Sequence, residues 1–291
     1  MTTSCRNKIK NNIKCGFYGC VVLIEDDYQR FFAGKIALDK NSIKMLQHEY
    51  SILNMLKGSE YIIKVIELCD FISDINFKLS NGRNLETGEE YKMIVMEYIQ
   101  GSNDLSDILN SSINFIDAYY KSVIIQIIKA VNFCHQTGVF CLDLNLSNIL
   151  YYIENSEIKI KLIDFGTVIT DEKQKDNCIQ QDYRSILKLF ILLIIKKHKK
   201  EILLEDYSSL IQESDFKDFI KKINRDDVFS VTEKSFINYM VDSSNTITIK
   251  DILNHDVFKS NIELSKASFH EFYEKDINEL YKNILRHVKS K

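Results

Sequence analysis

The amino-acid sequence predicts an α+β fold built as one domain. Apolar segments with the composition of strands gather before residue 98, at Phe31–Leu38, Ile62–Ser73 and Tyr91–Tyr98. Beyond them, Ala118–His135 carries apolar residues at helical spacing. The chain has 291 residues, of which 45% are hydrophobic, so it can bury a sizeable core. No internal repeat or long linker indicates a second domain.

Composition excludes several classes of partner. The net charge of −3 gives no electrostatic reason to bind nucleic acid or an anionic membrane. The most apolar run, Ile186–Ile195, contains Lys188 and is too short to cross a bilayer. Met1–Lys10 does not have the pattern of a secretory signal. We therefore expect a cytoplasmic protein that acts on or binds other proteins, without nucleic-acid or membrane partners.

The cysteines predict free thiols in a reducing compartment. They are odd in number and include no Cys-x-x-Cys pair, which argues against a disulfide framework or a zinc site. The seven are Cys5, Cys15, Cys20, Cys69, Cys134, Cys141 and Cys178.

Two features near the N-terminus suit a phosphate ligand. Gly16 and Gly19 lie in the strand-like run Ile13–Val22, and glycine lets a backbone approach a phosphate closely. Lys35 is the one lysine of the apolar strand Phe31–Leu38. Each feature alone is also explained without a ligand, the glycines by a hairpin turn and the lysine by a stem lying on apolar surface.

The central part of the chain predicts a metal–phosphate site. Asp143 stands five residues before Asn148, and Asp164 follows two short apolar segments, Ile149–Ile153 and Ile158–Ile163. We expect these segments to pair as a hairpin, which brings the loop before its first strand beside the residue that ends its second. Carboxylate and amide oxygens are hard ligands suited to Mg²⁺.

Here the sequence resembles the protein kinase superfamily. Its catalytic loop reads His-Arg-Asp-Leu-x-x-x-Asn and its metal motif Asp-Phe-Gly, and this chain has Cys141-Leu142-Asp143-Leu144 with Asn148, then Asp164-Phe165-Gly166. The resemblance implies a bilobal fold, with a small, mainly β N-lobe at residues 1–98 and a larger helical C-lobe at 99–262. The catalytic domain would span about residues 13–258, followed by a helical extension at 263–291.

The resemblance also implies ATP and Mg²⁺ as cofactors, with Mn²⁺ as an alternative ion. Asp143 would orient the acceptor hydroxyl, Asn148 and Asp164 would hold the metal, and Lys35, paired with Glu49, would contact the phosphates. Met96 would be the gatekeeper between the lobes, and Asp104 would lie near the ribose. The residues expected around the nucleotide are Ile13, Gly16, Gly19, Val21, Ala33, Lys35, Met96, Glu97, Ile99, Asp104 and Leu150.

The chain departs from the family pattern at its catalytic loop and after it. Cys141 and Leu142 replace His and Arg, and without that Arg we expect no activation by phosphorylation of the following segment. Asn145 replaces a lysine that steadies the γ-phosphate, which predicts slower transfer. Only Thr167–Gln181 separates the metal motif from a predicted central helix opening at Asp182, and it contains no Ala-Pro-Glu motif. Further on, Thr246 stands where the family has an Arg that pairs with that Glu.

Three functions agree with these residues. The complete set of nucleotide and metal groups favours an ATP-dependent protein kinase acting on Ser or Thr. The shortened segment also suits a pseudokinase that works through a binding partner, or a small-molecule kinase that needs no peptide platform. Transfer from labelled ATP to protein or small-molecule acceptors discriminates among them.

Overall fold

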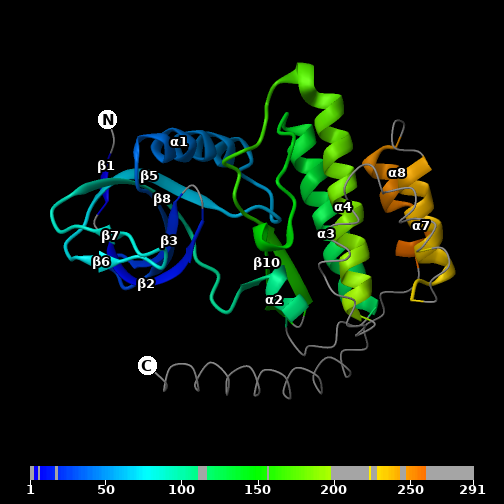
Figure 1. Ribbon diagram of the computed structural model, residues 1–291, viewed down its shortest axis with the longest axis horizontal. Helices are drawn as coiled ribbons and strands as arrows, with labels where there is room; N and C mark the ends of the chain where they lie inside the picture. The colour runs from blue at the N-terminus through cyan, green and yellow to red at the C-terminus, as the bar shows by residue number, and fades with distance from the viewer. Residues whose placement is uncertain are drawn as a thin grey trace, which may run out of the picture.

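The computed structural model confirms a bilobal α+β fold (Figure 1). It describes residues 3–5, 7–16, 19–110, 117–155, 157–197, 223, 228–242 and 247–259. The strand-rich N-lobe lies to one side of the helices α3, α4, α7 and α8. The helical extension predicted at 263–291 and the position of Thr246 lie outside the described residues. No helix within the described ranges is long and apolar enough to cross a bilayer.

The N-lobe contains a sheet of six strands in the order β1-β5-β8-β4-β3-β2. All neighbours are antiparallel except β1, which runs parallel to β5. Alternate residues of β3, among them Val22 and Ile24, are fully buried, as expected for a strand with one face in a core. The strands are β1 (Thr3–Cys5), β2 (Lys8–Cys15), β3 (Cys20–Glu25), β4 (Phe31–Ala37), β5 (Val65–Ile72) and β8 (Glu90–Glu97).

Helix α1 (Lys40–Met55) packs on this sheet and carries Glu49 into the lobe. It begins at Asp39, whose carboxylate accepts hydrogen bonds from the backbone N–H groups of Asn41 and Ser42. The hydroxyl of Ser42 donates to Asp39 and accepts from its backbone N–H, which completes a capping box. Further along α1, the buried residues Leu46, Glu49, Ile52 and Leu53 share one face of the helix.

Two strand features were not predicted. The stretch between the predicted strands Ile62–Ser73 and Tyr91–Tyr98 contains a small hairpin of β6 (Phe77–Lys78) and β7 (Asn84–Leu85), whose turn passes through Gly82 at φ +86°. The N-terminal strand β1 adds to the edge of the sheet beside β5. Its pairing joins residues more than sixty positions apart, which a local pattern cannot reveal.

The C-lobe is built around the helices α3 (Asp117–Gln136) and α4 (Lys175–Lys197), which pack side by side (Figure 1). The apolar face of α3 is buried, and Phe190 of α4 meets Phe236 of α7 edge to face with ring centroids 4.7 Å apart. The remaining described elements are β9 (Asn103–Asp104), α2 (Leu105–Asn110), β10 (Ile149–Glu154), β11 (Glu157–Leu162), α7 (Val231–Asp242) and α8 (Ile249–Leu253).

The predicted hairpin exists, whereas the start of α4 differs from the prediction. Strands β10 and β11 pair antiparallel with Ile149 opposite Leu162, within one residue of the expected bounds. Helix α4 begins at Lys175, not at Asp182, because no glycine or proline interrupts the chain between them and Asp171 caps the short turn Glu172–Gln174 that leads into it. The segment after the metal motif is therefore even shorter than predicted.

The expectation of free thiols is wrong for six of the seven cysteines. Disulfides join Cys5 to Cys69, Cys15 to Cys20, and Cys141 to Cys178. Cys134 is buried and forms no disulfide. Two of the bridges span 64 and 37 residues of sequence. They exist because the fold brings distant residues together, and the spacing of cysteines in the sequence contains no sign of that.

Candidate active site

Lys35, Glu49 and Asp164 form a charged cluster between the lobes. The Nζ of Lys35, on β4, lies 2.6 Å from Oε2 of Glu49 and 2.9 Å from Oδ1 of Asp164. Lys35 is 8% exposed and Glu49 only 2%, while the side chain of Asp164 is 39% exposed. The buried ammonium thus has a buried carboxylate behind it and a more accessible one in front. The sequence prediction that Lys35 and Glu49 pair is borne out by this contact.

The cluster keeps Lys35 charged. Burial lowers the pKa of Lys35, but the carboxylates of Glu49 and Asp164 outweigh burial and raise it above its usual value. Burial raises the pKa of Glu49, and the nearby Asp164 adds to this, while Lys35 opposes both. A permanently positive ammonium held at this point can bind an anionic ligand such as a phosphate.

The catalytic loop holds Asp143 and Asn148 in contact. The Nδ2 of Asn148 donates to the side chain of Asp143 at 3.1 Å and to its backbone carbonyl at 3.0 Å. With its nitrogen engaged in this way, the amide of Asn148 presents its oxygen as a ligand atom. A small cavity lies between the loop and the metal motif, and Asp143, Asn148 and Asp164 all line it. The predicted convergence of these three residues is therefore present.

The donor set fits Mg²⁺ bound together with phosphates. Asp164 adopts a left-handed backbone conformation at φ +64°, and Phe165 after it is buried. In the described part of the chain, no group of three or more His, Cys, Asp or Glu could hold a metal ion by itself. One amide oxygen and one carboxylate would leave most coordination positions to water and phosphate oxygens, as Mg²⁺ prefers.

Asn145 has a structural role that the sequence did not reveal. Its side-chain oxygen accepts hydrogen bonds from the backbone N–H groups of Ser147 and Asn148, at 3.0 and 3.2 Å. It thereby caps the short 3₁₀ turn Leu146–Asn148, which places Asn148 beside Asp143. Asn145 therefore shapes the catalytic loop, besides lacking the positive charge that a lysine would have there.

A buried carboxylate of α4 fixes the residues before Asp143. Asp182 is fully buried, accepts a hydrogen bond from the backbone N–H of Leu142 at 2.7 Å, and lies 2.8 Å from Nε2 of His135. Burial raises the pKa of Asp182, while His135 and the backbone N–H groups of Cys141 and Leu142 oppose the rise. Asp182 thus joins α4 to both the catalytic loop and α3, and its contact to His135 was not predicted.

Comparison with known proteins identifies the family. A family model described as a protein kinase domain matches residues 8–186, which is more than half of the chain. The chain belongs to the protein kinase family. The match starts in β2 and ends in α4, so it includes every residue of the cluster and loop described above.

Several curated kinases are similar to this family member. CDPK-related kinase 3 of Arabidopsis thaliana is 28% identical over 138 residues, covering 46% of this chain and 20% of the plant protein. Probable serine/threonine-protein kinase fnkE of Dictyostelium discoideum is 34% identical over 131 residues, covering 44% and 9%. Calcium/calmodulin-dependent protein kinase type 1 of Caenorhabditis elegans is 24% identical over 275 residues, covering 84% and 72%. This kinase thus spans a fifth or less of the first two relatives.

The glycine hairpin of this kinase is tightly constrained. The backbone N–H of Gly16 donates to the carbonyl of Gly19 at 2.9 Å, and the Cys15–Cys20 disulfide joins the strands on either side. A Cβ at Gly19 would lie 2.6 Å from the backbone oxygen of Ile36, so only glycine fits there. Residues 17 and 18 lie outside the described ranges.

The remaining predicted nucleotide residues lie along the strands that enclose the region between the lobes. Met96 is buried, Ala33 and Ile99 pack against the core, and Ile13 is exposed. Val21 pairs with Lys35 across β3 and β4, and Leu150 pairs with Asp104 across β10 and β9.

Two other predicted residues make contacts of their own. The carboxylate of Glu97 accepts from the backbone N–H of Lys64 and pairs with Lys161 at 2.9 Å. Lys14, which replaces the first glycine of the motif, reaches Asp104 at 2.6 Å. Lys14 therefore lies at the predicted ribose end of the site, a position that the sequence could not give because β2 and β9 are ninety residues apart.

Proposed function

We propose that this kinase-family protein transfers the γ-phosphate of ATP to a Ser or Thr hydroxyl of a protein substrate, with Mg²⁺ or Mn²⁺ as the metal ion. The contact of Lys35 with both Glu49 and Asp164, beside the Asp143–Asn148 pair, supports this most directly. Phosphoryl transfer needs positioning and charge neutralisation more than covalent chemistry. The chain has groups for both, and three of them, Asp143, Asn148 and Asp164, line one small cavity.

Each group has a role that follows from its surroundings. The Lys35 ammonium, kept charged by its two carboxylates, would bind phosphate oxygens. Asp143 is exposed and hydrogen bonded on one side by Asn148, so its carboxylate would accept the proton of the acceptor hydroxyl. Asp164 and the oxygen of Asn148 would hold the metal ion, which neutralises phosphate charge when bound.

The backbone between the lobes would bind the adenine. The N–H of Glu97 already donates to the carbonyl of Lys64 at 2.9 Å. The carbonyl of Ile99 accepts from both the N–H and the hydroxyl of Ser102. The carbonyl of Glu97 and the N–H of Ile99 would then serve as the acceptor and donor that an adenine edge requires, and the buried side chain of Met96 would lie behind them.

The names of relatives support a protein substrate, whereas the short segment after the metal motif argues against one. Several relatives are named as protein kinases, and two of them as probable serine/threonine-protein kinases. The short segment Thr167–Gln174 offers little surface for a peptide, which favours docking of a whole protein elsewhere on the chain. The same feature favours, as a second candidate, a pseudokinase or a small-molecule kinase.

Thermal unfolding with and without MgATP tests the binding half of this proposal. A ligand at about 100 times its Kd stabilises the native state by about 2.7 kcal/mol, so the Tm of the full chain should rise. Asp164→Asn should lose most of that rise, and Lys10→Met, an exposed lysine on β2, should retain it. A Tm that does not move with MgATP in the wild type would refute nucleotide binding.

A further inference from the structure

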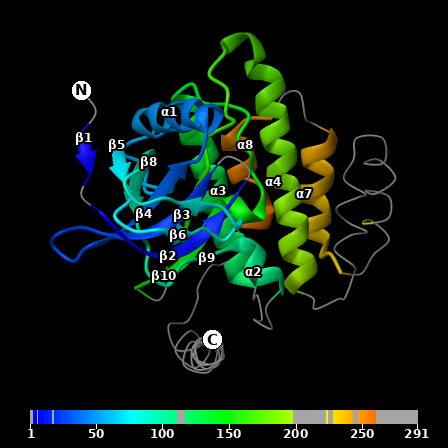
Figure 2. The same cartoon turned by 60° about the vertical axis from the view of Figure 1, so that its left-hand side comes forward.

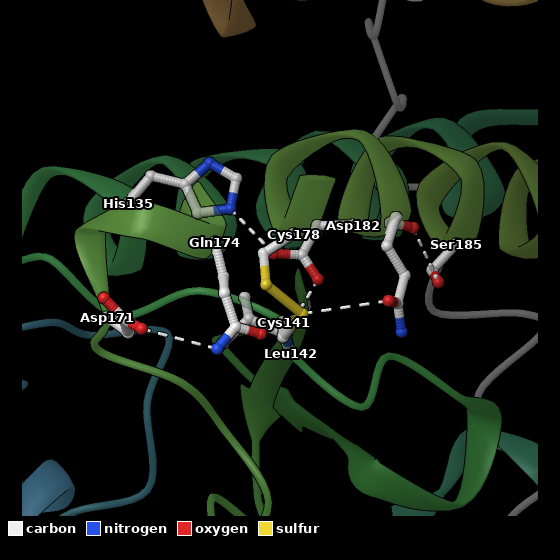
Figure 3. Close-up of a disulfide and its surroundings, with 9 residues drawn as sticks. His135, Cys141, Leu142, Asp171, Gln174, Cys178, Asp182 and Ser185 are labelled. Carbon is white, nitrogen blue, oxygen red and sulfur yellow. Dashed lines mark hydrogen bonds and ion pairs between the residues drawn. A yellow bond between two sulfur atoms is a disulfide. The ribbon is translucent and has the colours of Figure 1, made fainter. Parts of the chain in front are cut away.

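One disulfide connects the catalytic loop directly to helix α4 (Figure 3). Cys141 lies two residues before Asp143, and Cys178 lies in the first turns of α4, with the two Cα atoms 4.5 Å apart. The bridge closes a segment that contains the whole catalytic loop, the β10–β11 hairpin and the metal motif. Its position makes it different from the other two disulfides, which lie within the N-lobe.

The disulfide and Asp182 hold the same two residues. Asp182 lies one helical turn after Cys178 on α4 and binds the backbone N–H of Leu142, while Cys178 binds the side chain of Cys141. Figure 3 shows both attachments beside one another on one side of the helix. The loop is therefore anchored to α4 twice, once through hydrogen bonds and once covalently.

The anchored backbone is strained. Cys141 has φ +54°, a left-handed conformation that non-glycine residues adopt rarely and only when their surroundings hold them in it. The disulfide is one of the two contacts with α4 that hold it. Loss of this bond would leave Asp182 alone to maintain a conformation that relaxes readily, and Asp143 two residues later would move with it.

The two sulfurs differ in accessibility. Cys178 is only 3% exposed, whereas Cys141 is partly exposed next to the surface residue Gln181. An external thiolate would therefore attack the sulfur of Cys141, with Cys178 as the leaving group.

We propose that the Cys141–Cys178 pair is a thiol-exchange site that controls the position of the catalytic loop, with the disulfide form holding Asp143 in place and the dithiol form releasing it. The thiolate of a dithiol reductant forms a mixed disulfide with Cys141 and expels Cys178. The second thiol of the reductant then releases Cys141. Two electrons and two protons pass to the pair, and the reductant becomes a disulfide. This inference rests on the proposed phosphoryl transfer for its effect on rate.

A redox titration of the full chain tests the proposal. The protein would be equilibrated in mixtures of reduced and oxidised dithiothreitol, and each cysteine pair would be quantified by differential alkylation and mass spectrometry. Transfer from γ-labelled ATP and hydrogen exchange at the amide of Leu142 would be measured in the same samples. Reduction of Cys141–Cys178 should lower the transfer rate by about tenfold to a hundredfold, because a small displacement of a catalytic group has an effect of that size.

Two variants separate this pair from the others. Cys178→Ser should be slow and insensitive to the reductant, because it has no Cys141–Cys178 disulfide to lose. Cys5→Ser removes a disulfide at the edge strand β1 and should keep the redox response of the wild type. A Cys178→Ser protein that does not fold leaves the wild-type titration, which needs no variant, to decide the question.

Every outcome bears on the proposal. A transfer rate that follows the reduction of Cys141–Cys178, together with faster exchange of the Leu142 amide, supports it. A rate and an exchange that stay constant on reduction overturn it, as does a rate that rises. If neither the disulfide form nor the dithiol form transfers phosphate, the proposed function fails. Faster exchange at the Leu142 amide on reduction would then still support the proposal that the disulfide holds the loop, and unchanged exchange would overturn it.

Discussion

The carboxylate of Asp182 accepts a hydrogen bond from the backbone N–H of Leu142 at 2.7 Å. This contact joins a fully buried charge on α4 to the residue immediately before Asp143. Because buried polar groups must be hydrogen bonded, the position of the loop and the satisfaction of Asp182 depend on each other. The arrangement of the catalytic residues is thus an extension of the C-lobe core.

Replacing Asp182 with alanine should therefore lower both stability and activity. The change removes the partner of His135 and of the Leu142 N–H, and loss of one member of a buried charged network destabilises by roughly 3–5 kcal/mol. Asp182→Asn keeps an acceptor for the N–H and should lose less. Urea unfolding of the three proteins checks the order, and equal stabilities for alanine and asparagine would contradict it.

The Lys14–Asp104 pair should make a small contribution that disappears in acid. Burial raises the pKa of Asp104, but hydrogen bonds from Lys14 and Ser106 outweigh burial, so the pKa ends below its ordinary value. An acid whose pKa is depressed by folding contributes stability above its unfolded pKa, about 3.9, and loses it as the pH falls through the folded pKa. Lys14→Met should lower the free energy of unfolding by roughly 0.5 kcal/mol at neutral pH, since Lys14 is half exposed and its charge is screened by solvent.

The check is the difference in unfolding free energy between the wild type and Lys14→Met as the pH falls. It should shrink toward zero as the pH falls through the lowered pKa of folded Asp104, below which the carboxyl group is protonated in both folded and unfolded chains. Lys10→Met, which removes a lysine of the same strand paired with Glu25, controls for the loss of charge on β2. A difference that grows in acid would mean that Lys14 acts through another group.

Restoring a lysine at position 145 should not accelerate transfer. A lysine would add positive charge near the phosphates, but it would remove the cap that Asn145 provides to Ser147 and Asn148, at a cost of about 1 kcal/mol. Asn145→Asp keeps an accepting oxygen and separates capping from charge. We expect Asn145→Lys to be no faster than the wild type in single-turnover transfer, and a faster lysine variant would show that charge outweighs loop geometry.

The sequence predicted best those features that depend on neighbouring residues. The β10–β11 hairpin follows from alternation within a dozen positions, and it brings Asp143, Asn148 and Asp164 together as expected. The contact of Lys35 with Glu49 was predicted only through the family resemblance, because nothing in the two segments themselves shows that α1 packs with that face on the sheet.

Features that join distant segments could not be predicted in this way. The parallel strand β1, the Cys141–Cys178 disulfide and the contact of His135 with Asp182 all join residues that are far apart in the sequence and close in the fold. The predicted start of α4 was too late. The family resemblance placed the start at Asp182, whereas Asp182 lies inside a helix that begins at Lys175. Asn145 was interpreted by the charge it lacks, whereas its hydrogen bonds depend on the turn that follows it.

Transfer of the γ-phosphate by Asp143→Asn and by the wild type tests the central claim most directly. Both proteins would be incubated with γ-labelled ATP, Mg²⁺ and a panel of whole proteins and small molecules, after a thermal shift has shown that each binds MgATP. We predict that the wild type labels protein on Ser or Thr, and that Asp143→Asn binds MgATP but transfers at least ~100-fold more slowly, because it lacks the group that accepts the hydroxyl proton. Equal rates for the two proteins, or a wild type that binds MgATP and labels nothing, would contradict the account.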